Sequence, residues 1–346
     1  MPQSKPAPFA TRLLAWWDEH GRKDLPWQHP RTPYRVWISE IMLQQTQVAT
    51  VIPYFERWMD SYPDIATLAA APEDEVLSHW SGLGYYARAR NIIKTARVCT
   101  EHHGGQLPRG SEALNALPGI GLSTANAIVS QATDRPAAVL DGNVRRVLAR
   151  HTATSGWTGS AAVQKTLWKA AQARLPGERG ADYTQAIMDL GALVCRRANP
   201  SCAECPVDAD CRALAENRTA EIPGSKPRSK VREKTLHMLI VQDGKGRVLL
   251  EKRPGTGVWG GLWCLPEAGA RAVEYDAENA VELPLLTHRL SHLKLYIRPL
   301  LASPAKTTGV KCDTTLGWFD RHQRQALGLP RPVTHLLEKL DDGDFK

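Results

Sequence analysis

The sequence predicts two domains of different fold class: an all-α domain over residues 1–222 and a smaller α+β domain over residues 235–346. The first part repeats apolar residues at intervals of three and four, which is the helical period. The second part changes to short runs bounded by turn residues, which is typical of strands. Between them, residues 223–234 hold five basic residues, one acid and two prolines, the composition of a solvated linker.

In the first domain, helical periodicity alternates with short loops that contain Pro and Gly. The expected helical segments are Ile38–Phe55, Asp74–Trp80, Ala87–Glu101, Ser123–Gln131 and Val144–His151. In the second domain, Leu236–Gln242 and Arg247–Lys252 are expected to form two strands joined by the turn Asp243–Gly246. A further strand is expected at Leu293–Leu301 and a closing helix at Val333–Lys339.

Composition excludes several classes of protein. An apolar content of 42% and a charged content of 23% are those of a globular protein in water. No apolar run reaches membrane-spanning length, and Met1–Ala10 lacks the apolar core of a signal peptide. We therefore expect a cytoplasmic protein that does not associate with membranes.

The net charge of +8 permits an anionic partner, but the positive charge is not spread evenly. Residues 1–222 carry 24 Lys and Arg against 22 Asp and Glu, so this domain is nearly neutral. If it binds DNA, it must do so through local basic clusters and backbone amides.

Four of the seven cysteines fall within seventeen residues and form the ladder C-x6-C-x2-C-x5-C, at Cys195, Cys202, Cys205 and Cys211. Four thiolates at such short spacing can hold a [4Fe–4S] cluster or a zinc ion. Zinc sites more often combine two short cysteine pairs of the form C-x2-C or C-x4-C, whereas this ladder has one such pair. The uneven gaps therefore favour the cluster. Disulfides are the third alternative, and the missing signal peptide argues against them.

The segment Leu117–Gly121 reads Leu-Pro-Gly-Ile-Gly between two expected helices. Pro ends the first helix, and the glycines permit a tight turn into the second. Such a turn presents backbone N–H groups at a helix N-terminus, where a phosphate can bind. An ordinary helix–turn–helix connection is the alternative.

Two carboxylates, Asp141 and Glu40, stand in sequence contexts that indicate a function. Asp141 precedes the apolar helix at Val144–His151, so it is either an N-cap or a catalytic residue. Glu40 stands in the otherwise apolar segment Trp37–Gln45, where a carboxylate is costly unless it is paired or used. Cleavage of a glycosidic bond uses two carboxylates in different environments, one to donate a proton and one to stabilise a cation.

These motifs together resemble the endonuclease III superfamily of helix-hairpin-helix DNA glycosylases, and more narrowly the MutY-type adenine DNA glycosylases. The motifs occur in one order along the chain, at Ser39–Thr46, Gly82–Arg88, Leu117–Gly121, Leu140–Arg146 and the cysteine ladder. The resemblance covers nearly the whole chain. It implies a [4Fe–4S] cluster on the ladder and an all-α glycosylase domain followed by a Nudix-like domain.

The resemblance also implies roles for catalytic residues. Glu40 matches the general acid that protonates the adenine and assists water. Asp141 matches the aspartate that stabilises the oxocarbenium-like sugar, and Asn143 matches a residue that helps to hold the active-site network.

Other matched positions contact DNA in the family. Gln45 and either Tyr85 or Tyr86 match positions that enter the base stack beside the opposing base. Gln185 resembles a pocket residue near the adenine. The alternatives are polar residues on helix surfaces and core tyrosines. Phosphate contacts are expected from the turn that contains Gly119 and Gly121 and from two arginines beside the ladder, Arg196 and Arg197.

Ser123 marks a departure from the bifunctional relatives. Those proteins carry a lysine at the start of the helix after the Gly-x-Gly turn, and its amine forms a Schiff base that leads to strand cleavage. Ser123 has no amine, and Arg145 stays protonated. The resemblance therefore implies a monofunctional enzyme that uses water, with a bifunctional lyase as the alternative.

The second domain resembles the Nudix-like domain of MutY proteins. Gly261 and Glu267 keep the G-x5-E opening of a Nudix box, but the metal-binding acidic stretch is absent from Tyr275–Ala280. This departure argues against a Nudix hydrolase. The tryptophans of Trp259–Trp263 are expected to fill the small core.

In the family, this domain recognises 8-oxoguanine opposite adenine. The segment Thr287–His292 matches its Phe-Ser-His loop, with Leu290 in place of Phe. Ser291 and His292 are the expected contacts, and a loop hydroxyl in a turn is the alternative for Ser291.

The expected function is removal of adenine mispaired with 8-oxoguanine or guanine in double-stranded DNA, in base excision repair. The target adenine must leave the duplex to reach Glu40 and Asp141. We expect a monomer, located at the nucleoid if the source is bacterial. A DNA damage sensor without enzymatic activity is a further alternative, and the two carboxylates argue against it.

Overall fold

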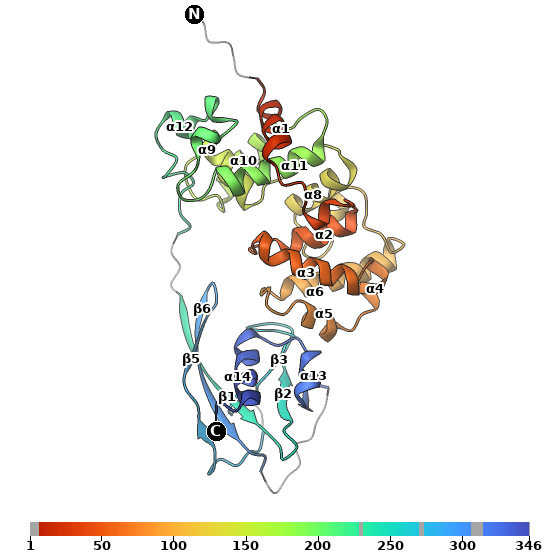
Figure 1. Ribbon diagram of the computed structural model, residues 1–346, viewed down its shortest axis with the longest axis vertical. Coiled ribbons are helices and arrows are strands. Elements are labelled where there is room, and N and C mark those ends of the chain that lie inside the picture. The colour runs from red at the N-terminus through yellow and green to blue at the C-terminus, as the bar shows by residue number, and fades with distance from the viewer. Residues whose placement is uncertain (1–6, 228–230, 270–272, 306–313, 346) are drawn as a thin grey trace, which may run out of the picture. The chain divides into compact units, whose positions relative to one another are not determined.

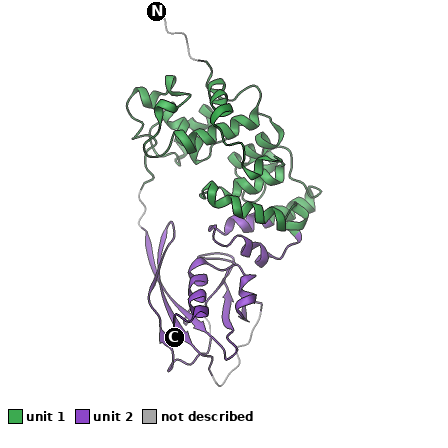
Figure 2. Cartoon of the chain, in the orientation of Figure 1, with its two compact units in different colours: residues 1–69, 94–228 green, residues 70–93, 229–346 purple. Residues whose placement is uncertain are grey.

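The computed structural model describes residues 7–227, 231–269, 273–305 and 314–345. Residues 228–230 of the expected linker therefore lie outside the described residues. The chain forms two compact units, coloured separately in Figure 2. The first unit comprises Met1–Ala69 and Lys94–Arg228, and the second comprises Ala70–Ile93 and Ser229–Lys346. The expected domain boundaries at 222 and 235 stay predictions.

The first unit is helical, as the sequence predicts (Figure 1). Its longer helices are α1 (Phe9–His20), α2 (Pro33–Met42), α3 (Val48–Ser61), α6 (Ala87–His102), α8 (Leu122–Thr133), α9 (Gly142–His151), α10 (Ala161–Gln172) and α11 (Gly180–Asp189). Shorter helices lie between them at α4 (Ile65–Ala70), α5 (Glu73–His79), α7 (Ser111–Asn115) and α12 (Arg212–Ala215), of which α5 belongs to the second unit. The core of this unit joins α1, α9, α10 and α11 through apolar side chains that include Leu13, Leu148, Leu167 and Ala186.

The expected helix over Ile38–Phe55 is two helices, so this prediction was wrong. The chain breaks between the end of α2 at Met42 and the start of α3 at Val48. Gln45 lies in this break with φ of +60°, a left-handed conformation that a helix does not contain. Apolar periodicity continues across the break, because both helices bury one face, and so the pattern did not reveal it.

The second unit contains two sheets. In the first, β1 (Arg232–Val241) runs parallel to β6 (Leu293–Ala302), which also pairs antiparallel with β4 (Val281–Glu282) and β5 (Leu286–Arg289). In the second, β2 (Val248–Lys252) lies between β3 (Trp263–Cys264) and β7 (Leu316–Phe319). Helices α13 (Arg321–Gln325) and α14 (Arg331–Asp342) complete the unit, and α14 packs Val333, Leu336 and Leu337 into its core.

The two expected strands and the turn between them are confirmed, and each strand pairs mainly with a strand from elsewhere in the unit. The Asp243 carboxylate accepts hydrogen bonds from the N–H groups of Lys245 and Arg247, which closes the turn. Beyond one bridge from Gln242 to Val248, the two strands diverge into different sheets. The sequence pattern gives the strands and the turn but not their distant partners.

No helix among the described residues is long and apolar enough to cross a membrane.

Candidate active site and cysteine pocket

Glu40 lies at the end of α2 and is partly buried. Its Oε1 accepts a hydrogen bond of 3.0 Å from Nε2 of Gln131, a side chain of α8 that is 3% exposed. The pKa of Glu40 is raised to about 8, mainly by burial and further by the charge of Asp141, while the Gln131 hydrogen bond opposes the rise. Glu40 therefore keeps its proton at neutral pH, as a general acid must.

Asp141 is the N-cap of α9. Its Oδ1 accepts a hydrogen bond of 2.7 Å from the Val144 N–H. Burial raises the pKa of Asp141, opposed by the hydrogen bonds from Val144 and Asn143 and by the charge of Arg146. Because the Asp141 charge also acts on Glu40, the structure brings the two predicted carboxylates together in different surroundings. Asp141 is thus a helix cap as well as a candidate for catalysis.

The turn before α8 has the expected geometry. Gly119 adopts φ of +76°, which a side chain would strain, and Gly121 is the N-cap of α8 without a side-chain cap. The first N–H groups of α8 are therefore the groups that can bind a phosphate. Ser123 in the first turn of α8 uses its Oγ to accept a hydrogen bond of 2.9 Å from the Leu140 N–H, directly before Asp141.

Helix α9 joins the carboxylate site to the cysteine loop. Asn143 accepts a hydrogen bond of 2.7 Å from Arg146, whose guanidinium also donates to the carbonyls of Gly191 and Cys195, both at 2.7 Å. Gly191 approaches so closely that a Cβ there would lie 2.6 Å from Cβ of Asn143. Asn143 therefore belongs to a network in which its backbone N–H faces Asp141 and its side chain, through Arg146, faces the cysteine loop.

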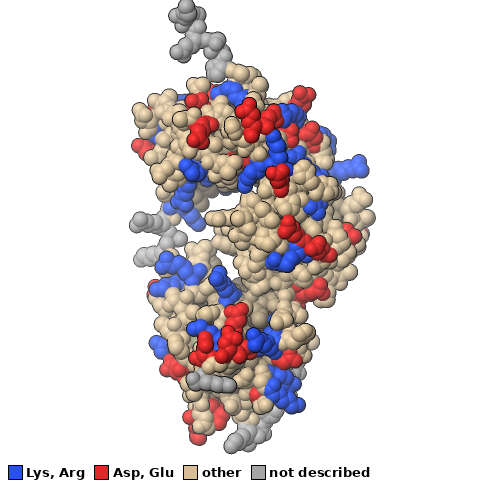
Figure 3. Space-filling view, in the orientation of Figure 1, with Lys and Arg blue, Asp and Glu red and all other residues tan. Residues whose placement is uncertain are grey.

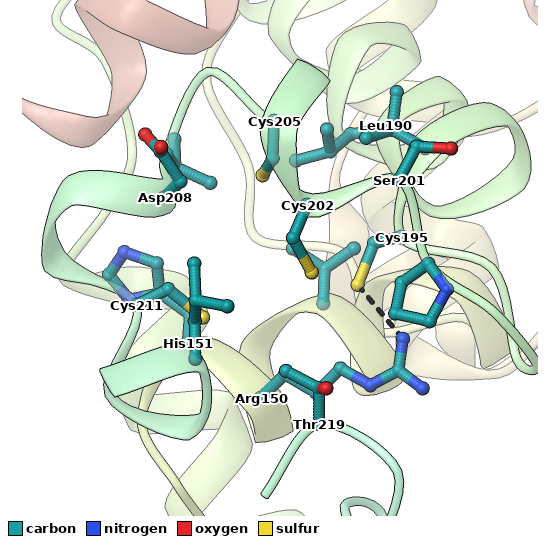
Figure 4. Close-up of a pocket in the computed structure, with 15 residues that line it drawn as sticks. Arg150, His151, Leu190, Cys195, Ser201, Cys202, Cys205, Asp208, Cys211 and Thr219 are labelled. Carbon is teal, nitrogen blue, oxygen red and sulfur yellow. Dashed lines mark hydrogen bonds between the residues drawn. The ribbon is translucent and has the colours of Figure 1, made fainter. Parts of the chain in front are cut away.

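The four cysteines of the ladder line one pocket between α9, the π-helical turn Leu190–Val194 and α12 (Figure 4). All six described cysteines are free thiols. Arg150, which is 3% exposed, lies beside this pocket and donates a hydrogen bond of 3.3 Å to Sγ of Cys195. It also donates to the carbonyls of Ile222, Arg196 and Arg197, at 2.8, 2.7 and 3.0 Å.

The donor set of the pocket fits a metal–sulfur group. Four free thiols line this one pocket, and cysteine thiolates are the ligands of iron–sulfur clusters. Burial raises the pKa of the Cys202, Cys205 and Cys211 thiols, to about 12 for Cys205. The thiolate form therefore needs positive charge beside it, and Arg150 supplies one such charge.

The residues expected to contact DNA differ in their exposure. Gln45 is exposed in the left-handed break after α2. Tyr85 is 48% exposed with φ of +48°, whereas the Tyr86 hydroxyl donates a hydrogen bond of 3.0 Å to the Leu329 carbonyl. Of the two tyrosines, Tyr85 is thus the better candidate for stacking. Arg196 and Arg197 are both exposed on the cysteine loop.

Gln185 lies on α11 among buried polar side chains. It is 2% exposed and donates a hydrogen bond of 2.8 Å to Asp189, which also binds Arg22 and Trp17. The Gln185 Oε1 is buried without a hydrogen-bond partner. A contact between Gln185 and adenine stays a prediction.

In the second unit, Ser291 and His292 are exposed at the turn between β5 and β6. The Ser291 hydroxyl lies 3.3 Å from Nδ1 of His292. Leu290 is half-buried and packs against the apolar core of the unit, so it does not present a wedge to a ligand. The strand β5 covers Leu286–Arg289, so half of the expected loop is a strand.

The described residues that follow Glu267 in the Nudix box, 273–280, form no helix. The segment Tyr275–Ala280 contains a bridge from Tyr275 to Pro304 and no helix. The Glu267 carboxylate pairs with Arg253 at 2.7 Å. Trp263 is 7% exposed, as expected of a core residue, whereas Trp259 is partly exposed.

Figure 3 shows basic and acidic side chains interspersed on the visible face of the helical unit, in keeping with its nearly neutral composition.

Sequence reasoning missed three residues of the site: Gln131, Arg146 and Arg150. The two arginines follow each other at i and i+4 on α9, which places them on one helix face. That spacing was a usable signal. The sequence contained no comparable signal for Gln131, because a single polar residue near a helix end has many roles.

Two solved structures resemble the helical part of the chain. A thermostable thymine-DNA glycosylase is 28% identical, with a TM-score of 0.53 over 60% of this chain and 95% of that one. Endonuclease III in a non-covalent DNA complex is 25% identical, with a TM-score of 0.52 over 60% of this chain and 94% of that one. Together with the paired carboxylates, this fold defines the class of helix-hairpin-helix DNA glycosylases.

Sequence comparison narrows the class. The family described as HhH-GPD superfamily base excision DNA repair protein matches residues 38–173, and the NUDIX domain matches residues 237–339. An adenine DNA glycosylase of Buchnera aphidicola (subspecies Baizongia pistaciae) is 37% identical over 340 residues, which cover 96% of each chain. That of Mus musculus is 38% identical over 82% of this chain and 66% of its own. The chain belongs to the adenine DNA glycosylase family, which confirms the resemblance, the fold class and the enzyme class predicted from the sequence.

Proposed function

We propose that this protein is a monofunctional adenine DNA glycosylase that removes adenine paired with 8-oxoguanine or guanine. One observation carries the proposal: two carboxylates, Glu40 and Asp141, lie close enough to interact and have different surroundings. That arrangement suits glycosidic hydrolysis, in which one carboxyl donates a proton and the other stabilises a sugar cation.

In the proposed reaction, protonated Glu40 donates its proton to a ring nitrogen of the extruded adenine. The bond between the sugar C1′ and the base then breaks, and the electron pair leaves with the adenine. The Asp141 carboxylate stabilises the positive sugar until water adds to C1′. The Glu40 carboxylate takes the proton that this water loses, which restores the enzyme.

Base release measures this function directly. A duplex with a labelled strand is incubated with the protein, once with adenine opposite 8-oxoguanine and once opposite guanine, and half of each sample is treated with alkali. We expect strand breaks after alkali for both mispairs. Intact strands after alkali for both would overturn the proposal.

The pKa of Glu40 predicts the pH dependence of the chemical step. Because the protonated form is active, the single-turnover rate should fall as the pH rises through about 8. The Gln131 hydrogen bond lowers this pKa, so Gln131→Leu should move the decline upward by about one pH unit. The control is Thr133→Ala, which changes an exposed hydroxyl of the same helix. Identical pH profiles for Gln131→Leu and wild type would contradict the role of Gln131.

Ser123 predicts the absence of lyase activity. Its hydroxyl accepts from the backbone before Asp141 and has no amine to attack the sugar. The wild type should leave abasic sites intact until alkali is added, and Ser123→Lys should gain covalent trapping by borohydride. Ser123→Ala loses the hydroxyl without gaining an amine and should not be trapped. Efficient trapping of the wild type would place the protein in the bifunctional class.

We propose further that Cys195, Cys202, Cys205 and Cys211 hold a [4Fe–4S] cluster, which would stabilise the loop around them and can exchange electrons. The support is a pocket with four free thiols, together with the clusters that the family carries. Protein purified without oxygen should contain about four irons per chain. Cys202→Ser should lose iron, whereas Cys264→Ala, outside the ladder, should keep it. One zinc and no iron in the wild type would contradict the cluster.

The remaining expectations are part of the same proposal. Tyr85 and Gln45 would contact the base opposite the adenine, and Ser291 and His292 would contact 8-oxoguanine. The Gly119–Gly121 turn, Arg196 and Arg197 would bind DNA phosphates. The protein would act as a monomer in the cytoplasm, at the nucleoid of a bacterium.

A further inference from the structure

The loop that carries Tyr85 is rigid within itself. Trp80 is fully buried, and its indole N–H donates a hydrogen bond of 2.9 Å to the Gly84 carbonyl. The Arg88 guanidinium donates to the carbonyls of Leu83 and Gly84, at 3.0 and 3.2 Å, and lies over the Trp80 ring. The loop is thus fixed to the end of α5 through Trp80 and to the first turn of α6 through Arg88.

Several contacts of α5 are made with the C-terminal part of the chain. Residues 70–93 group with residues 229–346 in one compact unit (Figure 2). Leu77, which is fully buried, packs so tightly on Gly328 that a Cβ there would lie 2.6 Å from the leucine Cβ. The Ser78 hydroxyl of α5 donates to the Gln325 carbonyl at 2.8 Å, and the Arg90 guanidinium in the first turn of α6 donates to the Gly260 carbonyl.

Asp74 makes a charged contact between α5 and the sheet that contains β2 and β3. Its Oδ1 lies 2.7 Å from Nζ of Lys252 on β2, and its Oδ2 accepts a hydrogen bond of 3.1 Å from the indole N–H of Trp263 on β3. The Lys252 ammonium also lies over the Trp263 ring, 5.8 Å from its centroid. One carboxylate in the first turn of α5 thus binds two neighbouring strands of one sheet.

We propose that Asp74 is a positioning residue through which the β2–β3 sheet sets Tyr85 against the base opposite the target adenine. This inference rests on the proposed function, because Tyr85 is assigned to that base there. It gives the Nudix-like fold a second route to mispair recognition, beside Ser291 and His292. A positioning residue acts through another group, so its removal should have no effect once that group is absent.

A double-mutant cycle tests this property. Affinity is measured for a duplex with a non-cleavable 2′-fluoro-adenosine opposite 8-oxoguanine, for wild type, Asp74→Ala, Tyr85→Ala and the double variant. Asp74→Ala should weaken binding about fivefold in the wild-type background and leave binding unchanged in the Tyr85→Ala background. The control is Glu75→Ala, which removes an exposed carboxylate from the same helical turn and should match the wild type.

The outcomes separate this inference from the proposed function. In one outcome the wild type releases adenine, but the double variant loses affinity by the product of the Asp74→Ala and Tyr85→Ala losses. The positioning role is then overturned and the glycosylase function stands. Unchanged binding by Asp74→Ala overturns it as well. If Asp74→Ala has a lowered melting temperature, Lys252→Met replaces it in the cycle and must give the same non-additivity. Failure of the wild type to release adenine would overturn the proposed function itself.

Discussion

Asp141→Asn should release adenine about a thousandfold more slowly than the wild type, because the proposed mechanism assigns the Asp141 charge to stabilisation of the sugar cation. The fold around the residue should survive. Asn is as good an N-cap as Asp, so its Oδ1 can still accept from the Val144 N–H at the start of α9. We therefore expect mispair binding close to that of the wild type, measured with a non-cleavable duplex, beside a nearly absent single-turnover rate.

Asp134→Asn is the matched control for this substitution. Asp134 also lies at a helix end, and its Oδ1 accepts a hydrogen bond of 2.9 Å from the Ala181 N–H. Its charge is not near Glu40 in the described contacts, so its rate should stay near that of the wild type. A near-wild-type rate for Asp141→Asn, or an equal loss in both variants, would refute the assigned role.

Arg150→Met should have the second large effect, on the cysteine loop. The substitution keeps an unbranched side chain but removes hydrogen bonds to three carbonyls and to Sγ of Cys195. Since buried carbonyls without partners are costly, we expect a loss of at least about 3 kcal/mol in the free energy of unfolding. The measurements are the urea midpoint and the iron content after gel filtration, and both should fall.

Lys169→Met on α10 is the control, because it also removes a cation from the helical unit but at an exposed position. Its urea midpoint and iron content should match those of the wild type. If Arg150→Met kept both values, the guanidinium would not hold the loop.

The sequence predicted the parts of the site that are set locally. The cysteine ladder, Asp141 before a helix and Glu40 in an apolar segment are each visible within a few residues. The structure adds the partners that come from far along the chain, such as Gln131 for Glu40 at a separation of 91 residues. No local pattern records such a pair, since either residue has many alternatives on its own.

The error in the fold has the same origin. The break at Gln45 was hidden because α2 and α3 both bury an apolar face, so the helical period continued across it. The strands on either side of Asp243 are joined by a local turn, yet each pairs mainly with a distant strand. Their actual partners, β6 for β1 and both β3 and β7 for β2, lie up to about 70 residues away, where periodicity carries no information.

The contacts of α5 with the C-terminal part of the chain also affect how the protein folds during synthesis. The hydrogen bond from Ser78 to Gln325 spans 247 residues, so α5 leaves the ribosome long before its partners exist. At 5–20 residues per second, the delay is roughly 10–50 s. During that time Leu77 has no Gly328 to cover it, and its apolar surface is open to chaperones. A chain that stops early would keep this exposed surface permanently, so a premature stop codon in the last third of the gene should yield aggregation rather than a working helical fragment.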